Sequence, residues 1–181
     1  YLLLKKLMYN FLLPPFLIFI FINYFMDREF RILNGDYVSD YFNLDNGVLS
    51  GNCLGPLLFS LFINDIGSLL TTAFILFADD LVIYVDCTDF ERGVKELNEC
   101  IKGLEKWCLL NSMTINIQKT KYMYFFKSHD TRSKEFCLSC PAEIKICGET
   151  IDNVHSFKYL GVVLDSTLSF NAHYRHVENK M

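Results

Sequence analysis

The sequence predicts an α+β fold in which helices pack against short, mainly antiparallel strands. Segments of alternating polarity flank the turn signal Asn34-Gly35, and apolar runs rich in β-branched and aromatic residues flank Asp79-Asp80; both patterns are typical of β-hairpins. Between Thr88 and Leu110 the apolar residues instead recur every three or four positions, which indicates a helix with one face on a sheet. The chain has 181 residues, 51% of them hydrophobic, and so can form one domain with a core.

The first 27 residues are predicted to be helical. Leu2 to Met8 resembles the end of one helix, and Phe16 to Met26 a second that begins after Pro14-Pro15. The apolar stretch from Phe11 to Phe25 is interrupted by the prolines and falls short of the roughly 20 residues that a membrane-spanning helix needs. A buried core helix is therefore predicted, with a membrane anchor as the alternative.

Strands and turns are predicted next. Arg28 to Leu33 and Asp36 to Phe42 alternate in polarity around the first turn signal, as hairpin strands do. A glycine-rich stretch from Gly47 then leads to Pro56, which favours the first turn of a helix from about Leu57 to Leu70.

The central third of the chain has the clearest periodicities. The runs Ala73 to Ala78 and Leu81 to Val85 are predicted to be strands buried on at least one face. Thr88 and Glu91 have the spacing of a capping box at the start of the following helix. That helix is predicted to pack on the hairpin through an apolar stripe. The stripe consists of Phe90, Val94, Leu97, Ile101, Leu104 and Cys108.

Shorter elements complete the chain. A strand is predicted from Lys121 to Phe126, and a surface loop from Ser128 to Ser139. Short strands near Glu143 to Cys147 and Phe157 to Leu164 precede a helix from Asn171 onward.

Charge and cysteine content limit the possible functions. A net charge of −4 and a pI near 5.5 argue against a stand-alone nucleic-acid binder, which usually has a basic stripe. Seven scattered cysteines without a signal peptide predict reduced thiols in an intracellular protein, nuclear or cytoplasmic. A zinc site built from Cys137, Cys140, Cys147 and His155 is disfavoured because the spacing matches no common zinc motif.

Asp79 and Asp80 are the candidates for chemistry. Two adjacent acids at a turn repel each other at a cost of roughly 1 kcal/mol in water. A divalent cation turns that repulsion into attraction, and Mg²⁺ prefers carboxylate oxygen. The competing interpretation is a solvated polar turn.

The order of the motifs resembles the palm of reverse transcriptases, particularly those of non-LTR, LINE-type (jockey-like) retrotransposons. Three segments carry the resemblance first: Gly47-Val-Leu-Ser-Gly-Asn-Cys-Leu-Gly-Pro-Leu-Leu-Phe59, Phe62-Ile-Asn-Asp65 and Leu76-Phe-Ala-Asp-Asp80. It continues through Trp107, Asn116-x-x-Lys119-Thr120, Tyr159-Leu160-Gly161-Val162 and Leu168-Ser-Phe-Asn-Ala-His173. The resemblance spans nearly the whole chain in the family's order.

This resemblance implies part of an RNA-directed DNA polymerase: a palm-like antiparallel sheet packed with helices, without the upstream fingers and first palm strand. Residues 1–27 would lead into the palm, residues 28–165 would form it, and residues 166–181 would begin a thumb-like helical segment. The implied partners are an RNA template, a DNA primer and deoxynucleotides, with no membrane. The implied cofactor is Mg²⁺ or Mn²⁺. The oligomeric state is left open.

The resemblance also implies roles for individual residues. Asp79 would be the direct metal ligand and Asp80 the supporting one in a two-metal nucleotidyl transfer. Gly47, Ser50 and Gly51 would pass beside the incoming nucleotide and the template, where glycine lets the backbone approach closely.

Two further segments are assigned in the same way. Lys119 would lie near the nucleotide phosphates and offset leaving-group charge, unless it is an ordinary surface lysine. Tyr159, Leu160 and Gly161 would form the hairpin that supports the primer end, although a plain strand kink at Gly161 is an equal alternative.

Two departures from the family pattern predict weak or absent activity. Leu49, Ser50 and Asn52 stand where the family usually has G-V-P-Q-G-S, so the glutamine is missing. The family's third carboxylate comes from a strand that would precede Tyr1. The chain alone is therefore expected to be inactive. The alternative is a non-catalytic retroelement remnant acting as a nucleic-acid or protein binding module.

Overall fold

A computed structural model describes residues 2–44, 47, 51, 53–127 and 142–180, and it divides into two units. The first unit comprises Tyr1–Ser68 and Ile75–Val82. The second comprises Leu69–Phe74 and Ile83–Met181. The predicted loop from Ser128 to Ser139 lies outside the described residues, as do parts of the glycine-rich stretch that follows Gly47.

Three helices make the core of the first unit. Helix α1 (Leu2–Tyr9) contacts α2 (Pro15–Phe25) and α3 (Leu54–Ile63). Their buried contacts centre on Leu7, Ile18 and Leu58. Pro15 occupies the first turn of α2, where the missing N–H of proline costs no helical hydrogen bond. Both predicted N-terminal helices are confirmed to within one residue at each end.

The burial predicted for α2 holds on one side of the helix only. Ile18 is buried and Phe21 and Ile22 pack against the same core, whereas Phe16 and Phe19 are each 65% exposed. An all-round apolar sequence does not choose a face, and here a single side of the helix meets α1 and the rest of the core. Within the described residues, no helix combines the length and apolar character needed to cross a membrane.

Helix α3 begins three residues earlier than predicted. Pro56 is the third residue of the helix rather than the residue before it, and a proline is tolerated there because first-turn N–H groups have no helical acceptor. The α-helix ends at Ile63 and continues as a 3₁₀-helix, η1 (Asn64–Leu69), instead of running to Leu70.

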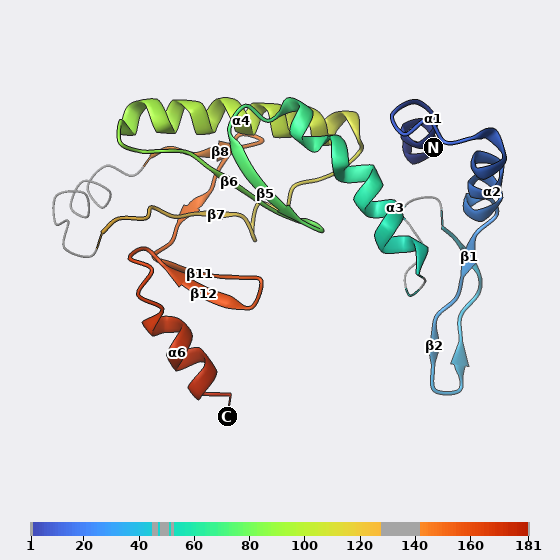
Figure 1. Cartoon of the computed structure of the whole chain (residues 1–181). Helices are drawn as coiled ribbons and strands as arrows, with labels where there is room; N and C mark the ends of the chain where they lie inside the picture. The colour runs from blue at the N-terminus through green and yellow to red at the C-terminus, as the bar shows by residue number, and fades with distance from the viewer. Residues whose placement is uncertain (1, 45–46, 48–50, 52, 128–141, 181) are drawn as a thin grey trace. The chain divides into compact units, whose positions relative to one another are not determined.

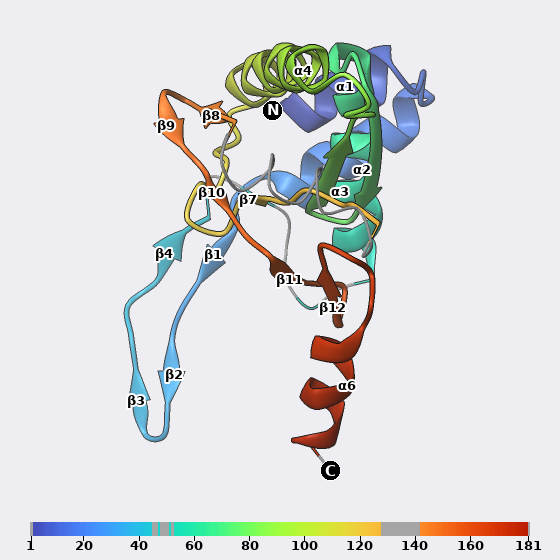
Figure 2. The same cartoon turned by 90° about the vertical axis from the view of Figure 1, so that its left-hand side faces the viewer.

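A narrow two-stranded ribbon projects from α2. Strand β1 (Glu29–Phe30) pairs with β4 (Phe42–Asn43), and β2 (Leu33–Asn34) pairs with β3 (Tyr37–Val38), both antiparallel (Figure 2). The predicted hairpin is confirmed with a shift of one residue, because Asn34 pairs with Tyr37 and the turn is Gly35-Asp36. Gly35 has φ +59°, which a residue with a side chain rarely adopts.

The hairpin around the two aspartates is also confirmed, with its turn one residue earlier than predicted, at Ala78-Asp79 instead of Asp79-Asp80. Strands β5 (Ala73–Phe77) and β6 (Asp80–Tyr84) pair in a two-stranded sheet, and a two-residue connection can join only antiparallel strands. The predicted burial of both strands is wrong for β5, in which only Leu76 is even partly buried. An apolar run predicts a strand but does not specify which element covers it.

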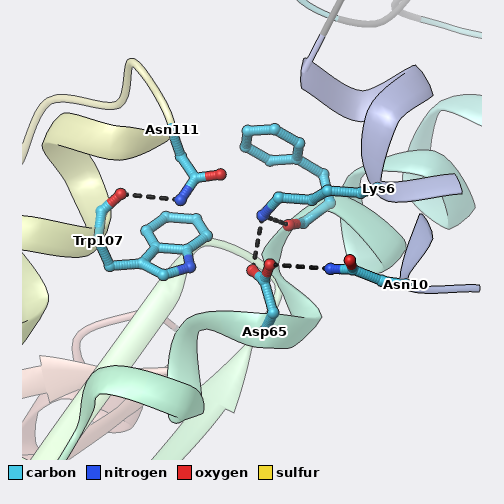
Figure 3. Close-up of polar contacts among 6 residues, drawn as sticks. Lys6, Asn10, Asp65, Trp107 and Asn111 are labelled. Carbon is cyan, nitrogen blue, oxygen red and sulfur yellow. Dashed lines mark hydrogen bonds and ion pairs between the residues drawn. The ribbon is translucent and has the colours of Figure 1, made fainter. Parts of the chain in front are cut away.

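Helix α4 (Phe90–Leu110) is the longest element of the second unit (Figure 1). Its start differs from the prediction: Asp89, not Thr88, is the N-cap, and its side chain accepts the N–H of Arg92 at 3.1 Å. The Thr88 hydroxyl instead donates to Asp86. At the other end the buried Asn111 side chain donates to the Trp107 carbonyl at 2.8 Å (Figure 3).

The apolar stripe of α4 packs against segments that follow the helix. Ile101 forms a core with Ala142, Ile144, Ile146 and Ile151. Partly buried side chains extend this core: Phe90, Val94, Leu97, Ile115, Ile117, Tyr122 and Tyr124. Ile101 and the neighbouring part of the stripe thus pack against residues at 115–124 and 142–151, whereas the sequence predicted the preceding hairpin. Periodicity fixes the apolar face of a helix and not the identity of the surface that meets it.

The remaining strands are short and pair two by two. Strand β7 (Lys121–Tyr122) is parallel to β10 (Asp152–Asn153), and β8 (Lys145–Ile146) is antiparallel to β9 (Glu149–Thr150). The predicted strand to Phe126 is therefore only two residues long. Among the described residues six two-stranded sheets form rather than one continuous sheet, so the palm-like arrangement stays a prediction.

The C-terminal part follows the prediction closely. Strands β11 (Ser156–Tyr159) and β12 (Val162–Asp165) form an antiparallel hairpin that contacts α6 (Asn171–Glu178) (Figure 1). A loop between β12 and α6 is organised by the Asp165 carboxylate. Its oxygens accept hydrogen bonds from the backbone and hydroxyl groups of Thr167 and Ser169 and from the Phe170 N–H, over 2.7–3.1 Å.

Candidate active site

The turn between β5 and β6 presents the two aspartates to solvent. Ala78 and Asp79 form the turn, and Asp80 is the first residue of β6. Ala78 has φ +50°, a left-handed conformation that costs a residue with a Cβ about 1–2 kcal/mol. Strained backbone of this kind concentrates at functional sites. Asp79 and Asp80 therefore project from a turn whose geometry its sequence does not favour.

Both carboxylates are exposed, and in the part of the chain that the structure describes neither takes part in a hydrogen bond or an ion pair. A turn built on its aspartates would bond them to nearby N–H groups, as Asp165 does in the loop before α6. Because the carboxylates of Asp79 and Asp80 are free, they are better suited to binding an external group than to stabilising the turn.

The oxygens of Asp79 and Asp80 are the type of ligand that a hard divalent cation prefers, but two side chains are few for such a site. Four carboxylate oxygens on adjacent residues are the ligands that Mg²⁺ and Mn²⁺ prefer. Over the described residues, no cluster of three or more His, Cys, Asp or Glu side chains could hold a metal ion. Asp79 and Asp80 would therefore hold such an ion through two side chains and water.

The glycine-rich segment is described at Gly47 and Gly51, and Ser50 lies outside the described residues. Both glycines have positive φ, +86° and +81°, and a Cβ built on either would meet no atom within 4 Å. Their backbone conformation, rather than lack of space, requires glycine. Open space beside both positions is consistent with close approach of another molecule.

Arg28 anchors the start of the glycine-rich segment through hydrogen bonds. This role of Arg28 was not predicted from the sequence. Its guanidinium donates to the Gly47 carbonyl at 3.1 Å and to the Leu44 carbonyl at 3.4 Å. Its Nε donates to the Phe25 carbonyl at 3.2 Å, so one side chain links the end of α2 to a segment 19 residues away. No local pattern could have indicated this, because the partners are backbone carbonyls.

Lys119 is exposed in a turn that follows α4. Its backbone N–H is bonded to the carbonyl and to the side-chain oxygen of Asn116, at 3.2 and 3.1 Å. The Thr120 hydroxyl donates to the same carbonyl at 2.8 Å. Asn116 thus stabilises the turn, and the Lys119 side chain stays exposed. The Asn116-x-x-Lys119-Thr120 spacing is what allows these local hydrogen bonds.

Tyr159, Leu160 and Gly161 form the tip of the β11–β12 hairpin. Tyr159 pairs with Val162, and the two central residues have φ +46° and +87°. Positive φ at both central positions is the pattern of a type I′ turn, so Gly161 is a turn residue and not a strand kink. The Tyr159 hydroxyl is enclosed and has no hydrogen-bond partner in the described structure.

The predicted site residues are divided between the units. Asp79, Asp80, Gly47 and Gly51 belong to the first, and Lys119 and the 159–161 turn belong to the second. Of the disfavoured zinc ligands, Cys137 and Cys140 lie outside the described residues, whereas Cys147 and His155 are exposed.

The chain belongs to the reverse transcriptase (RNA-dependent DNA polymerase) family, whose model matches residues 5–164. The order of motifs, the paired aspartates at a hairpin turn and the following helix agree with that assignment. The predicted resemblance to reverse transcriptases is thereby confirmed.

The relatives are proteins of mobile elements. The chain is 26% identical over 173 residues to the RNA-directed DNA polymerase from mobile element jockey of Drosophila funebris, covering 90% of this chain and 18% of that protein. It is 28% identical over 163 residues to the probable RNA-directed DNA polymerase from transposon BS of Drosophila melanogaster, covering 83% and 17%. The chain thus spans under a fifth of the curated relatives it matches. No solved structure matches it.

Proposed function

We propose that this chain is a segment of a retrotransposon RNA-directed DNA polymerase and that Asp79 and Asp80 carry its nucleotidyl-transfer chemistry. The observation that supports this most directly is the pair of free carboxylates at the end of a strained two-residue turn, one in the turn and one on the first residue of β6. The family match over residues 5–164 and the names of the relatives supply the polymerase class. The substrates proposed are an RNA template, a DNA primer and deoxynucleotides.

Asp79 and Asp80 are the residues that would hold Mg²⁺ or Mn²⁺. When bound, such an ion lowers the charge on the reacting phosphate and helps to ionise the primer hydroxyl. Asp79, in the turn, would act as the direct ligand, and Asp80, at the start of β6, would support it. Strand pairing with β5 limits the movement of Asp80, which favours a fixed ligand position.

The other site residues would position the substrates. Gly47, Ser50 and Gly51 would pass beside the nucleotide and template, with Arg28 holding the start of that segment through Gly47. Lys119 would offset phosphate charge. The 159–161 turn would support the primer end, where the positive φ of Leu160 and Gly161 keeps the tip narrow.

The same proposal assigns residues 28–165 to the palm, with residues 1–27 leading into it and residues 166–181 beginning a thumb-like segment. Two carboxylates bind a divalent cation weakly compared with three. We therefore expect the chain by itself to be inactive.

Primer extension tests this function. The chain alone should give no detectable extension of a DNA primer on an RNA template with Mg²⁺ or Mn²⁺. Joining an upstream strand that carries an aspartate should tighten Mn²⁺ binding and give extension that both Asp79→Asn and Asp80→Asn abolish. Asp36→Asn, an exposed aspartate in the β2–β3 turn, is the matched control and should leave extension unchanged. Extension that survives Asp79→Asn would contradict the assignment.

A non-catalytic binding module is the second candidate. The lack of any three-residue metal cluster among the described residues favours it. The two candidates separate in the extended protein: a binding module would bind nucleic acid but would show no extension at any metal concentration.

A further inference from the structure

The turn that joins β8 to β9 contains an exposed cysteine. Ile146 pairs with Glu149, and the two residues between them, Cys147 and Gly148, have φ +51° and +82°. Positive φ at both central positions is the pattern of a type I′ turn, which favours Asn, Asp or Gly at the first of them. Cys147 therefore presents its thiol to solvent from a position at which turn chemistry favours another residue.

Helix α4 holds this turn through two contacts. Ile146, the residue before Cys147, lies in the same core as Ile101 of the helix. The Glu105 carboxylate accepts the Cys147 N–H. Ile101 and Glu105 are four residues apart, so both contacts lie along one face of α4. The place of Cys147 beside the helix is thus set by packing and by a hydrogen bond.

Cys108 continues that face of α4. It follows Glu105 by three positions, the spacing of neighbours on a helix surface. Side chains on an α-helix lean toward its N-terminus and cover the preceding turn, so the Cys108 thiol leans toward the level at which Glu105 holds Cys147. Cys108 is buried, at 9% exposure, whereas Cys147 is exposed. The Glu105 contact therefore brings an accessible thiol toward a buried one.

The electrostatics of Cys108 agree with this placement. Burial raises the pKa of the Cys108 thiol, and the charges of Cys147 and Glu105 raise it further. An electrostatic effect of one thiol on another falls off with distance, so it supports their closeness. The raised pKa keeps Cys108 protonated, and the thiolate rather than the thiol reacts with an oxidant. Cys147 is therefore the sulfur that an oxidant reaches first.

Two other described cysteines of the second unit lie too far along α4 to pair with Cys108. Cys100 precedes Cys108 by eight residues, about 12 Å along the helix axis, whereas a disulfide needs Cα atoms within about 7 Å. Cys87 lies near the start of the helix, where its sulfur would be 3.1 Å from a Cβ built on Gly93. Gly93 precedes Cys108 by 15 residues, about 22 Å along the axis.

We propose that Cys108 and Cys147 form a redox modification site, at which hydrogen peroxide converts the two thiols into a disulfide that joins α4 to the β8–β9 turn. The Cys147 thiolate attacks one peroxide oxygen, the O–O bond breaks, and hydroxide leaves a sulfenic acid on Cys147. The Cys108 sulfur then attacks the Cys147 sulfur, the S–O bond breaks, and a second hydroxide leaves. The two thiol protons convert both hydroxides to water. Two thiols and one peroxide thus give one disulfide and two waters.

The disulfide would change the stability of the second unit. It would close the chain between Cys108 and Cys147 into a loop and so restrict the unfolded state. It would also hold β8 on α4, where Ile146 and Ile101 share a core (Figure 1). Neither thiol is among the residues assigned to nucleotidyl transfer, so this inference does not depend on the proposed function.

Tryptic peptide mapping without reductant, after hydrogen peroxide treatment of the whole chain, tests the site. Trypsin releases Cys108 in residues 107–119 and Cys147 in residues 146–158, and neither peptide contains another cysteine. Oxidation should join the two peptides in a product two hydrogen atoms lighter than their sum, and dithiothreitol should separate them. A bond from Cys147 to any other cysteine of the chain, or to Cys147 of a second chain, would overturn the inference. So would the absence of a bond once Cys147 is oxidised.

Serine variants test the role of each sulfur. In Cys108→Ser the sulfenic acid of Cys147 has no partner, so its adduct with dimedone should be about tenfold more abundant than in the parent chain. Equal amounts in both proteins would overturn the assignment of Cys108. Cys147→Ser should leave Cys108 reduced. Cys87→Ser, at another exposed cysteine of the second unit, is the matched control and should form the bond as the parent does.

Thermal melts give a second readout. The oxidised parent should melt about 5 °C or more above the reduced parent, because the bond restricts the unfolded chain. Cys147→Ser should show no such difference between its treated and untreated forms. Its replaced side chain is exposed, and circular dichroism checks that the variant is folded. Equal shifts in the parent and in Cys147→Ser would show that oxidation acts elsewhere and would overturn the inference.

Discussion

The ammonium group of Lys6 lies 2.6 Å from a carboxylate oxygen of Asp65, although 59 residues separate them in the chain (Figure 3). Lys6 also donates to the Phe62 carbonyl at 2.7 Å and lies 4.5 Å from the centre of that residue's ring. The other Asp65 oxygen accepts from the Asn10 side chain at 3.3 Å. The lysine side chain is only 10% exposed, so its charge needs this compensation. The contact fastens α1 to the segment where α3 becomes η1.

Lys6→Met should lower the free energy of unfolding by about 1–3 kcal/mol, less than for a fully buried pair because the Asp65 side chain is one-third exposed. Lys5→Met is the matched control: the neighbouring lysine on the same helix is exposed, and its loss should change stability by less than about 0.5 kcal/mol. Urea unfolding measures both. A double-mutant cycle combining Lys6→Met with Asp65→Asn measures the coupling energy of the pair. A value near zero would show that the ion pair contributes nothing to stability.

Gly103→Ala should destabilise the protein, although the replacement of glycine by alanine within a helix usually stabilises it. In an exposed helix interior this change stabilises by about 1 kcal/mol. Here an added Cβ would overlap the carbonyl oxygen of Leu69, a backbone atom that cannot rotate away. We expect a loss of more than about 2 kcal/mol, measured by thermal melts. Ser60→Ala, at an exposed helical position in the first unit, should change stability little. A more stable Gly103→Ala protein would mean that α4 and Leu69 separate readily.

Asp89→Ala should cost about 0.5–2 kcal/mol because it removes the N-cap of α4. Thr88→Val is the informative comparison, since the sequence pattern assigned the cap to that residue. The Thr88 hydroxyl bonds only to the exposed Asp86, so the change should cost less than about 0.5 kcal/mol. Urea midpoints of the two variants compare them directly. A larger loss of stability in Thr88→Val than in Asp89→Ala would show that Thr88 is the N-cap, as the sequence predicted.

The ionised Asp165 carboxylate should make the stability of the fold decrease at low pH. The backbone N–H of Ser169 and the Thr167 hydroxyl, with further hydrogen bonds, lower the Asp165 pKa from 3.8 to about 2. A folded-state pKa below the unfolded one means that the contribution is fully present above about pH 4 and is lost as the pH falls to about 2. Asp165→Asn should cost about 1–3 kcal/mol at neutral pH.

The difference in melting temperature between the parent and Asp165→Asn should therefore shrink from pH 4 to pH 2. Asp36→Asn, at an exposed turn, is the control and should show no such convergence. A constant difference across this range would mean that the loop before α6 does not depend on the ionised carboxylate.

The predictions that held concern relationships between residues close in sequence. The spacing of apolar residues from Phe90 to Cys108 defined α4, and the turn signal at Asn34-Gly35 placed the β2–β3 hairpin to within one residue. The apolar runs on either side of Asp79-Asp80 placed a second hairpin, whose turn is Ala78-Asp79. Backbone preferences and the alternation of side chains act over a few residues, so the sequence displays them directly.

The candidate site was predictable as residue types and not as a set of contacts. The motif order identified Asp79, Asp80 and Lys119, and the family match supports the class to which they belong. The free state of the two carboxylates, the strain at Ala78 and the hydrogen bond from Arg28 to Gly47 are set by the tertiary structure. These features depend on which backbone atoms a side chain reaches, and residue type does not encode that.

The sequence by itself determined the helices, two of the hairpins and the family of this protein. Tertiary structure alone decided that Lys6 meets Asp65, that Ile101 packs on Ile144, and that Phe16 and Phe19 of α2 remain largely exposed. The physical reason is that apolar burial is non-directional: many surfaces can cover a stripe or a run equally well. The partner is selected by the packing of the whole chain, across separations over which no local pattern extends.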